Sequence, residues 1–306
     1  MISRRNIRVK VMQMLYSIET LEEQMKPGEP VKLLQKQFDQ SRQLFVFLVY
    51  FIAEVARYAE TYAKNRASKH LPTAEDLSIN TKIAGNESLW KILELPSYQT
   101  ALKEDKPQYI MDQELLKKIY LDLAASDLYK TYINVQGRDK KSEKEILEYI
   151  FTDLMLPNEL FTSYIEEHFN NWDDDGEMMN LLVLNFIAKP TGADLQQLVA
   201  PEKWRFAKLL LETCLEKKEL TMELIKPKLK NWDPERIAAL DMILMRMGVG
   251  EFLFFETIPP KVTINEYIDL AKEYSTPQSG HFVNGILDNI HKDLVKDDKM
   301  HKIAYK

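Results

Sequence analysis

Cysteine and glycine are scarce in this chain of 306 residues, which has one cysteine and nine glycines. The single cysteine, Cys214, excludes an internal disulfide and suits a reducing compartment. The glycines form neither a GxGxxG fingerprint nor a P-loop, and the sequence has no GxSxG motif. The common signatures of dinucleotide-binding proteins, P-loop NTPases and serine hydrolases are therefore missing.

Long apolar runs are missing as well. The densest one, Leu44 to Ala53, is far shorter than the roughly 20 residues that a bilayer-spanning helix needs. Arginine and lysine interrupt the apolar positions of the N-terminus, which is not the pattern of a signal peptide. The sequence predicts a soluble, cytoplasmic protein.

An excess of positive charge is the third absence, because the formal net charge is −6. Proteins that bind nucleic acid by bulk electrostatics are usually basic, so any such contact here must come from local patches. One patch runs from Ser3 to Lys10, with four positive charges and no acid, and the second is formed by Lys226, Lys228 and Lys230. Both could equally be solvated charged surface.

Helical periodicity dominates the rest of the chain, and no alternating strand pattern accompanies it, so the sequence predicts an all-α fold. Apolar residues from Ile7 to Leu21 mark a helix, from which Arg5 and Arg8 are expected to project together. Asp233 and Pro234 have the residue types of a helix start, with apolar positions from Ile237 onward. Two further helices follow, and the glycine of the second, Gly285, suggests either a close approach by a ligand or backbone, or a tight helix crossing.

Several of these C-terminal segments resemble the NusB family of transcription antitermination factors. The residues that carry the resemblance are Arg246 of MILMR, Glu251 of GEF, the IPPKVTINE–LAK block and the FVNG–LD block. At the N-terminus, Arg4, Arg5 and Arg8, followed by Leu15-Tyr16, are similar to the arginine-rich arm of the family. The resemblance implies a NusB-like helical bundle formed by residues 1–24 and 202–306.

The resemblance also implies a function without a cofactor and without catalysis. A NusB-type factor binds the boxA element of ribosomal RNA transcripts together with the ribosomal protein NusE, and the complex joins RNA polymerase. The RNA contacts implied for this chain are Arg4, Arg5, Arg8, Lys226, Lys228, Lys230, Gln278, His281 and Phe282. Asp241 and Glu251 are implied as contacts for the basic ribosomal protein.

Residues 25–201 have no counterpart in this resemblance and are expected to form an inserted helical region. Part of it, 145–186, resembles a diverged copy of 205–246 at a constant offset of sixty residues. The sequence Asn-Trp-Asp recurs after the second helix of each copy, at 171–173 and 231–233. The chain thus predicts a duplicated helical element.

The sequence also allows a function other than RNA binding. The acidic net charge and the large insertion favour a protein-interaction scaffold or homodimer that has lost specific RNA binding. Catalysis and metal binding find no support. Cys214 lies on an apolar helical face, the histidines lack metal-ligand spacing, and the partial calcium pattern at 171–176 has Leu182 where the loop requires Glu.

Overall fold

The computed structural model describes residues 2–21, 25–192, 194–229 and 237–303. Within these residues the chain is helical, with no strand, which confirms the predicted all-α class. The helices group into two compact units, residues 38–198 (unit 1) and residues 2–37 with 199–306 (unit 2). The sequence-based division into 1–24 plus 202–306 and 25–201 rests on motifs and stays a prediction.

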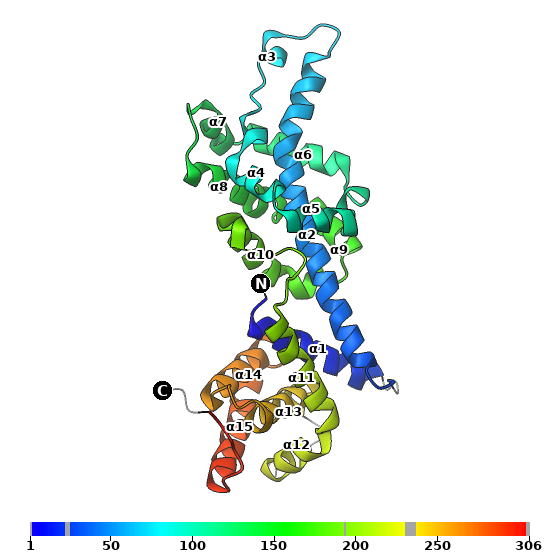
Figure 1. Ribbon diagram of the computed structural model, residues 1–306, viewed down its shortest axis with the longest axis vertical. Coiled ribbons are helices and arrows are strands. Elements are labelled where there is room, and N and C mark those ends of the chain that lie inside the picture. Colours follow the sequence, from blue (N-terminus) through cyan, green and yellow to red (C-terminus); the bar gives the residue numbers. More distant parts are fainter. Residues whose placement is uncertain (1, 22–24, 193, 230–236, 304–306) are drawn as a thin grey trace. The chain divides into compact units, whose positions relative to one another are not determined.

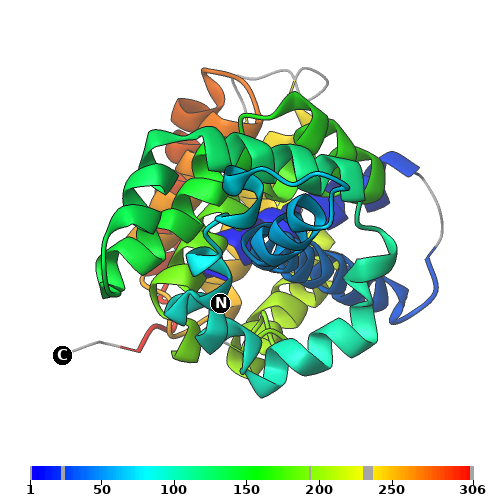
Figure 2. The same cartoon turned by 90° about the horizontal axis from the view of Figure 1, so that it is seen from above.

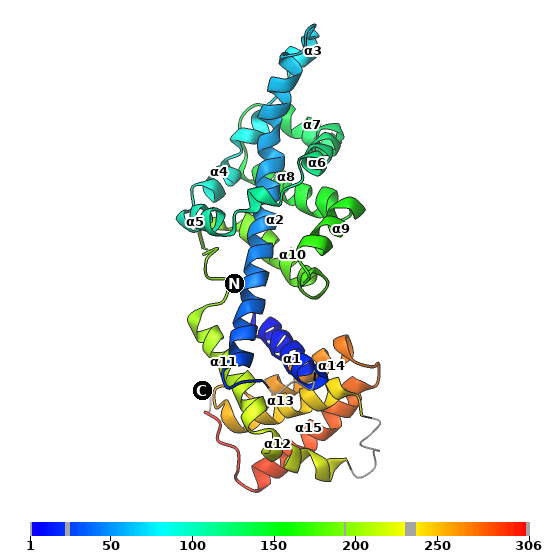
Figure 3. The same ribbon diagram turned by 90° about the vertical axis from the view of Figure 1, so that its right-hand side faces the viewer.

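Unit 1 is built around the long helix α2 (Glu29–Ala67), of which residues 38–67 belong to this unit. Its apolar residues from Leu44 to Ala53 are buried on every side, as expected for a helix at the centre of a core. Figures 1 and 3 show shorter helices on different sides of α2, and Figure 2 shows α2 nearly end-on with these helices around it. Aromatic pairs such as Phe51 and Phe161, with ring centroids 5.0 Å apart, connect it to them.

The other elements of unit 1 follow in chain order. They are α3 (Ala74–Leu77), η1 (Lys82–Gly85), α4 (Glu87–Leu93), α5 (Pro96–Asp105), η2 (Pro107–Tyr109), α6 (Gln113–Ala125), α7 (Asp127–Asn134), α8 (Lys140–Tyr149), η3 (Ile150–Met155), α9 (Glu159–His168), α10 (Trp172–Ala188) and η4 (Pro190–Gly192).

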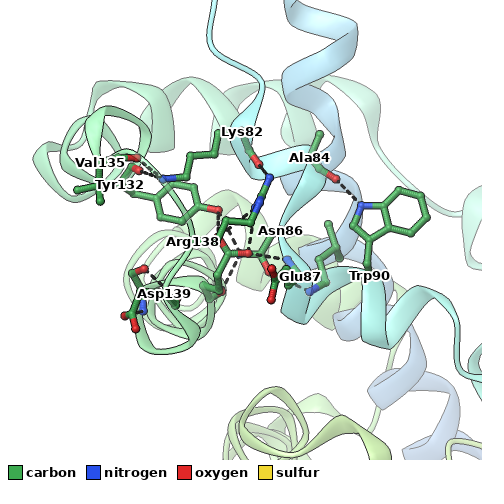
Figure 4. A network of polar contacts seen from close by, with 12 residues as sticks. Lys82, Ala84, Asn86, Glu87, Trp90, Tyr132, Val135, Arg138 and Asp139 are labelled. Atoms are coloured by element: carbon green, nitrogen blue, oxygen red, sulfur yellow. Dashed lines mark hydrogen bonds and ion pairs between the residues drawn. The ribbon is translucent and has the colours of Figure 1, made fainter.

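A buried carboxylate, Glu143 on α8, joins several segments of unit 1 through a polar network; Figure 4 labels its neighbours Asn86, Glu87, Tyr132 and Arg138. It is 1% exposed and accepts hydrogen bonds from the Tyr132 hydroxyl at 2.8 Å, Arg138 Nη1 at 3.1 Å and the Glu87 backbone N–H at 2.5 Å. Asn86 donates to the Glu143 carbonyl at 2.7 Å. Buried charges are costly unless they are paired, and here every donor comes from a different segment. The network therefore attaches three segments to α8, namely the start of α4, the end of α7 and the loop that precedes α8.

Unit 2 is a bundle around α13 (Ala239–Phe254), which is buried along most of its length. It contacts α1 (Arg4–Leu21), α11 (Pro201–Glu216), α12 (Lys218–Ile225), α14 (Pro260–Tyr274) and α15 (Ser279–Lys296). The short helix η5 (Lys226–Lys228) follows α12. Because α13 is apolar on all sides, it needs partners all round, and the five helices supply them.

The structure corrects several local expectations. Asp233 and Pro234 lie outside the described residues, and α13 begins only at Ala239, beyond Ile237. Gly285 is exposed, and no atom lies within 4 Å of a Cβ built on it, so it marks no tight helix crossing. The close approach is at Gly248, where a Cβ would lie 2.9 Å from Leu287.

The proposed duplication spans both units. Its first copy covers α8, η3, α9 and α10, and its second covers α11, α12 and the start of α13. The aspartates of the partial calcium pattern, Asp173, Asp174 and Asp175, lie in the first turn of α10, where the buried Asp175 accepts hydrogen bonds from Ser41 and Asn171. Common ancestry of the two copies stays a prediction.

Candidate nucleic-acid interface

The three arginines at the start of α1 occupy different environments. Arg4 is exposed, and the Arg5 side chain is 37% exposed and forms an ion pair with Glu273 at 2.6 Å. Arg8 is only 2% exposed. Arg5 and Arg8 therefore do not project together, because Arg8 belongs to the inward face of α1 with its neighbour Ile7.

Arg8 is held in the interior by two carboxylates. Its Nε and Nη2 donate to the two oxygens of Glu251 at 2.7 and 3.1 Å, and its Nη1 lies 3.2 Å from Glu266 Oε2. Burial by itself lowers the pKa of Arg8, but the hydrogen bond and charge of Glu251 outweigh it and raise the pKa above its usual value. This guanidinium is charged at every accessible pH and is buried against two carboxylates, an environment that does not favour its expected role as an RNA contact.

The carboxylate of Glu251 accepts from four donors. Besides Arg8, the Thr263 hydroxyl donates at 2.9 Å and the Tyr267 hydroxyl at 2.8 Å. Glu251 is 0% exposed, so it has neither the surface nor the spare oxygen for a protein partner. Asp241, 5% exposed, likewise accepts from Ser279 Oγ at 2.8 Å in the interior. Both acids are therefore buried in unit 2, and the expectation that they contact a partner stays a prediction that their burial does not favour.

A second buried pair joins α13 to the other end of α1. Arg246, 1% exposed, bonds to Glu19 and donates to the Cys214 carbonyl at 2.8 Å. Glu19 also bonds to Lys218 at 3.0 Å, and although burial opposes it, the charge of Arg246 holds the pKa of Glu19 below its usual value. Burial raises the pKa of Cys214 to about 12, so the thiol is not a nucleophile at neutral pH. Two ion pairs thus fix α1 on α13. In one, the acid is Glu251 on α13, and in the other, the base is Arg246 on α13.

Arg5, which is partly exposed, lies beside the end of α14 that leads into the loop to α15. The ion pair from Arg5 to Glu273 places the start of α1 against the last turn of α14. Gln278 and His281, which are exposed, follow within eight residues, and the Gln278 side chain does not cap α15. Figure 3 shows α1 and α14 side by side, as the ion pair requires. These residues form one candidate interface, with Phe282 half-buried at its edge.

Two further cations at this end of unit 2 were missed by sequence reasoning. Lys272, with a side chain 58% exposed, precedes Glu273, and its stem packs against Gly280. Arg205, exposed, precedes Phe206, whose ring lies under the Arg4 guanidinium at 5.5 Å. Neither residue stands in a basic run, so only the tertiary contacts of α1 reveal that they lie near Arg4 and Arg5.

The second basic patch is remote from this interface. Lys228 forms an ion pair with Asp293, near the end of α15, whereas Gln278 precedes the start of that helix. At 1.5 Å per residue, the intervening fifteen residues span about 22 Å. Lys226 is exposed, and Lys230 lies outside the described residues. The structure does not bring Lys226 and Lys228 together with Gln278.

Residues 167–292 match the family model described as "NusB family". Among curated proteins, the chain is 44% identical over 102 residues to the transcription antitermination protein NusB of Salinibacter ruber, covering 33% of this chain and 64% of the relative. It is 44% identical over 94 residues to NusB of Methylacidiphilum infernorum, covering 31% and 62%, and 47% identical over 79 residues to NusB of Desulfatibacillum aliphaticivorans, covering 26% and 55%. No solved structure matches.

The chain spans less than two thirds of the length of each of these curated relatives, and the family match leaves out the arginines of α1. Among the described residues, no helix has both the length and the apolar composition to cross a membrane. The match begins in α9 and includes α11 to α14 and most of α15, with Arg246 and Glu251, but not α1. Residues 167–292 of this chain are thus similar to the NusB family.

Proposed function

We propose that this chain is an RNA-binding transcription antitermination factor that acts on ribosomal RNA transcripts through a boxA-type element. In this role it binds the RNA together with the ribosomal protein NusE, as part of an antitermination complex with RNA polymerase. The proposal draws on the names of the relatives and on the resemblance of the α1 arginines to the family's RNA-binding arm. Its function is binding, and no step of it requires catalysis.

The observation that supports it most is the exposed Arg4 next to the partly exposed Arg5, which lies against the end of α14. Arginine side chains of this kind neutralise phosphates and release their counterions, and the planar guanidinium can also stack on bases. Gln278 and His281 add side chains that can hydrogen-bond to bases or phosphates. Together they provide both a charged and a base-contacting component in a protein whose net charge is −6.

The first experiment measures the affinity for a boxA-like RNA and a scrambled RNA at two salt concentrations, with and without NusE. The test variant is Arg4→Glu/Arg5→Glu. The matched control is Lys261→Glu/Lys299→Glu, which makes the same change in charge at exposed positions near the start of α14 and after the end of α15. These control positions lie at the other end of the α14–α15 hairpin.

We expect tighter binding to boxA, a further gain with NusE and a loss at high salt. The test variant should lose at least about tenfold in affinity, since two phosphate contacts are replaced by repulsion, while the control stays near wild type. Equal and weak binding to both RNAs, unaffected by NusE and by the charge reversal, would instead support a scaffold or homodimer that has kept the fold.

A further inference from the structure

An open hollow of about 470 Å³ lies in unit 1, where α5 and η2 meet α2. The residues that line it and can contact a ligand through charge, amide or ring are Tyr50, Gln99, Lys103, Lys106, Gln108 and Tyr109. Leu102 is its only aliphatic lining residue, and none of the lining residues is a carboxylate. Figures 1 and 3 both show α5 beside the middle of α2.

The charged groups that line the hollow are both lysines, and two of the three acids nearby are paired with arginines. Asp105, which separates the two lysines in sequence, accepts two hydrogen bonds from Arg42, both at 2.7 Å. Glu104 accepts from Gln196 at 3.3 Å. Glu54, one turn after Tyr50, is paired with Arg57 at 2.6 Å. The two exposed lysines therefore lie beside two acids that are paired with arginines and one, Glu104, that keeps its charge.

Tyr109 gives the hollow a face for a flat ligand. Its side chain is 80% exposed, although it closes a short helix that begins at the buried Pro107. The turn before it passes through Lys106 in the left-handed region, with φ at 49°, which costs energy for a residue other than glycine. On the opposite element, burial raises the pKa of Tyr50 to about 12, so its hydroxyl stays protonated at neutral pH.

We propose that this hollow binds single-stranded RNA, with a base stacked on Tyr109 and the adjoining phosphates at Lys103 and Lys106. Lysines beside an exposed ring are the combination that non-sequence-specific single-strand binding uses, because every base has a π-face and every linkage a charge. Gln99 and Gln108 can hydrogen-bond to base edges. The inserted unit thus carries an RNA site of its own, an inference that rests on the proposed RNA-binding role of the chain but on different residues.

The test uses the full chain and an oligouridine of about 20 nucleotides, together with the boxA-like and scrambled RNAs. The variants are Tyr109→Ala and Lys103→Glu/Lys106→Glu. The matched control is Lys117→Glu/Lys118→Glu, which reverses two exposed lysines on α6 of the same unit. Circular dichroism verifies folding, and Tyr109→Ala removes a side chain that is mostly in solvent. Photocrosslinking to 5-iodouridine RNA, mapped by mass spectrometry, reports the contact directly.

We expect Tyr109→Ala to weaken binding to all three RNAs by a similar factor, about fivefold or more, because stacking is sequence-tolerant. The lysine variant should weaken binding at least as much and reduce its salt dependence. The α6 control should change neither the affinity nor the salt dependence. A crosslink should map to Tyr109. The ratio between boxA and scrambled RNA, which reports the role proposed for unit 2, should stay unchanged. If the wild type bound the boxA-like and scrambled RNAs equally well, that result would therefore count against the boxA proposal and not against this one.

The inference is overturned if Tyr109→Ala and the lysine variant bind every RNA within twofold of wild type, with crosslinks confined to other peptides. It is also overturned if fluorescein-labelled oligoglutamate binds the wild type and not the lysine variant while the RNA affinities of the two are equal. That result would assign the hollow to an acidic protein segment.

Discussion

Replacing Arg8 with methionine tests whether the third arginine of α1 supports the fold or contacts RNA. The substitution keeps a long unbranched side chain but leaves Glu251, 0% exposed, with a charge that only Thr263 and Tyr267 still stabilise by hydrogen bonds. Removing one partner of a buried ion pair costs about 3–5 kcal/mol. Arg4→Met, at an exposed position, should change the free energy of unfolding by no more than about 0.5 kcal/mol.

Equilibrium unfolding in urea measures the loss, and hydrogen exchange of peptides from α13 assigns it to unit 2. A second variant, Arg8→Met/Glu251→Gln, removes the unpaired charge while leaving an amide oxygen for Thr263 and Tyr267. It should be more stable than Arg8→Met alone, and the double-mutant cycle should give a coupling of about 2 kcal/mol or more between Arg8 and Glu251.

The reasoning is refuted if Arg8→Met unfolds within about 1 kcal/mol of wild type while its affinity for boxA-like RNA falls. Arg8 would then be a nucleic-acid contact, as the resemblance to the family arm implied. If both stability and affinity fall, the affinity of the more stable double variant separates the two effects, because a structural role predicts that RNA binding recovers with the fold.

Further tests address glycines and pH. Gly248→Ala should destabilise unit 2 by about 1–3 kcal/mol in urea unfolding, because the new methyl group would lie 2.9 Å from Leu287; an unchanged midpoint would contradict the tight packing. Gly285→Ala should stabilise it by up to about 1 kcal/mol, since the site is open and helical; a loss of RNA affinity there would show that a ligand approaches this glycine. The pKa of Glu19 is lowered below 4.5, so its ion pair with Arg246 stabilises the fold above that pH and is lost as the pH falls through the lowered pKa. Glu19→Gln should therefore reduce stability at pH 7 and flatten its decline in acid, whereas a parallel pH profile would exclude this contribution.

Much of the fold could be predicted from the sequence because helical periodicity is a local property. The apolar spacing of Ile7, Val11 and Met14 located α1 and its buried face, and all three are buried. The dense apolar run from Leu44 to Ala53 lies within α2, which begins much earlier, at Glu29. The first turns of this helix have fewer apolar residues, so the sequence marks its start less clearly than its centre.

The candidate site was harder to predict because charge in a sequence does not show where a side chain points. Arg5 and Arg8 are both arginines of one basic run, yet Arg5 is at the surface and Arg8 is inside. The difference depends on Glu251, 243 residues away, whose oxygens compensate the buried guanidinium. The residues that carry the family resemblance on α13, Arg246 and Glu251, are accordingly ones that hold α1 in place.

By itself, the sequence determined the helical class, the placement of most helices and the resemblance to the NusB family, because these depend on local spacing and on motifs. Only the tertiary structure decided which charges are free to bind. In it, Arg8, Asp241 and Glu251 are buried and Arg4 is exposed. It also has a hollow beside Tyr109 that no sequence motif predicted. The physical reason is that burial and pairing are set by side chains distant in sequence, and a linear pattern does not contain those distances.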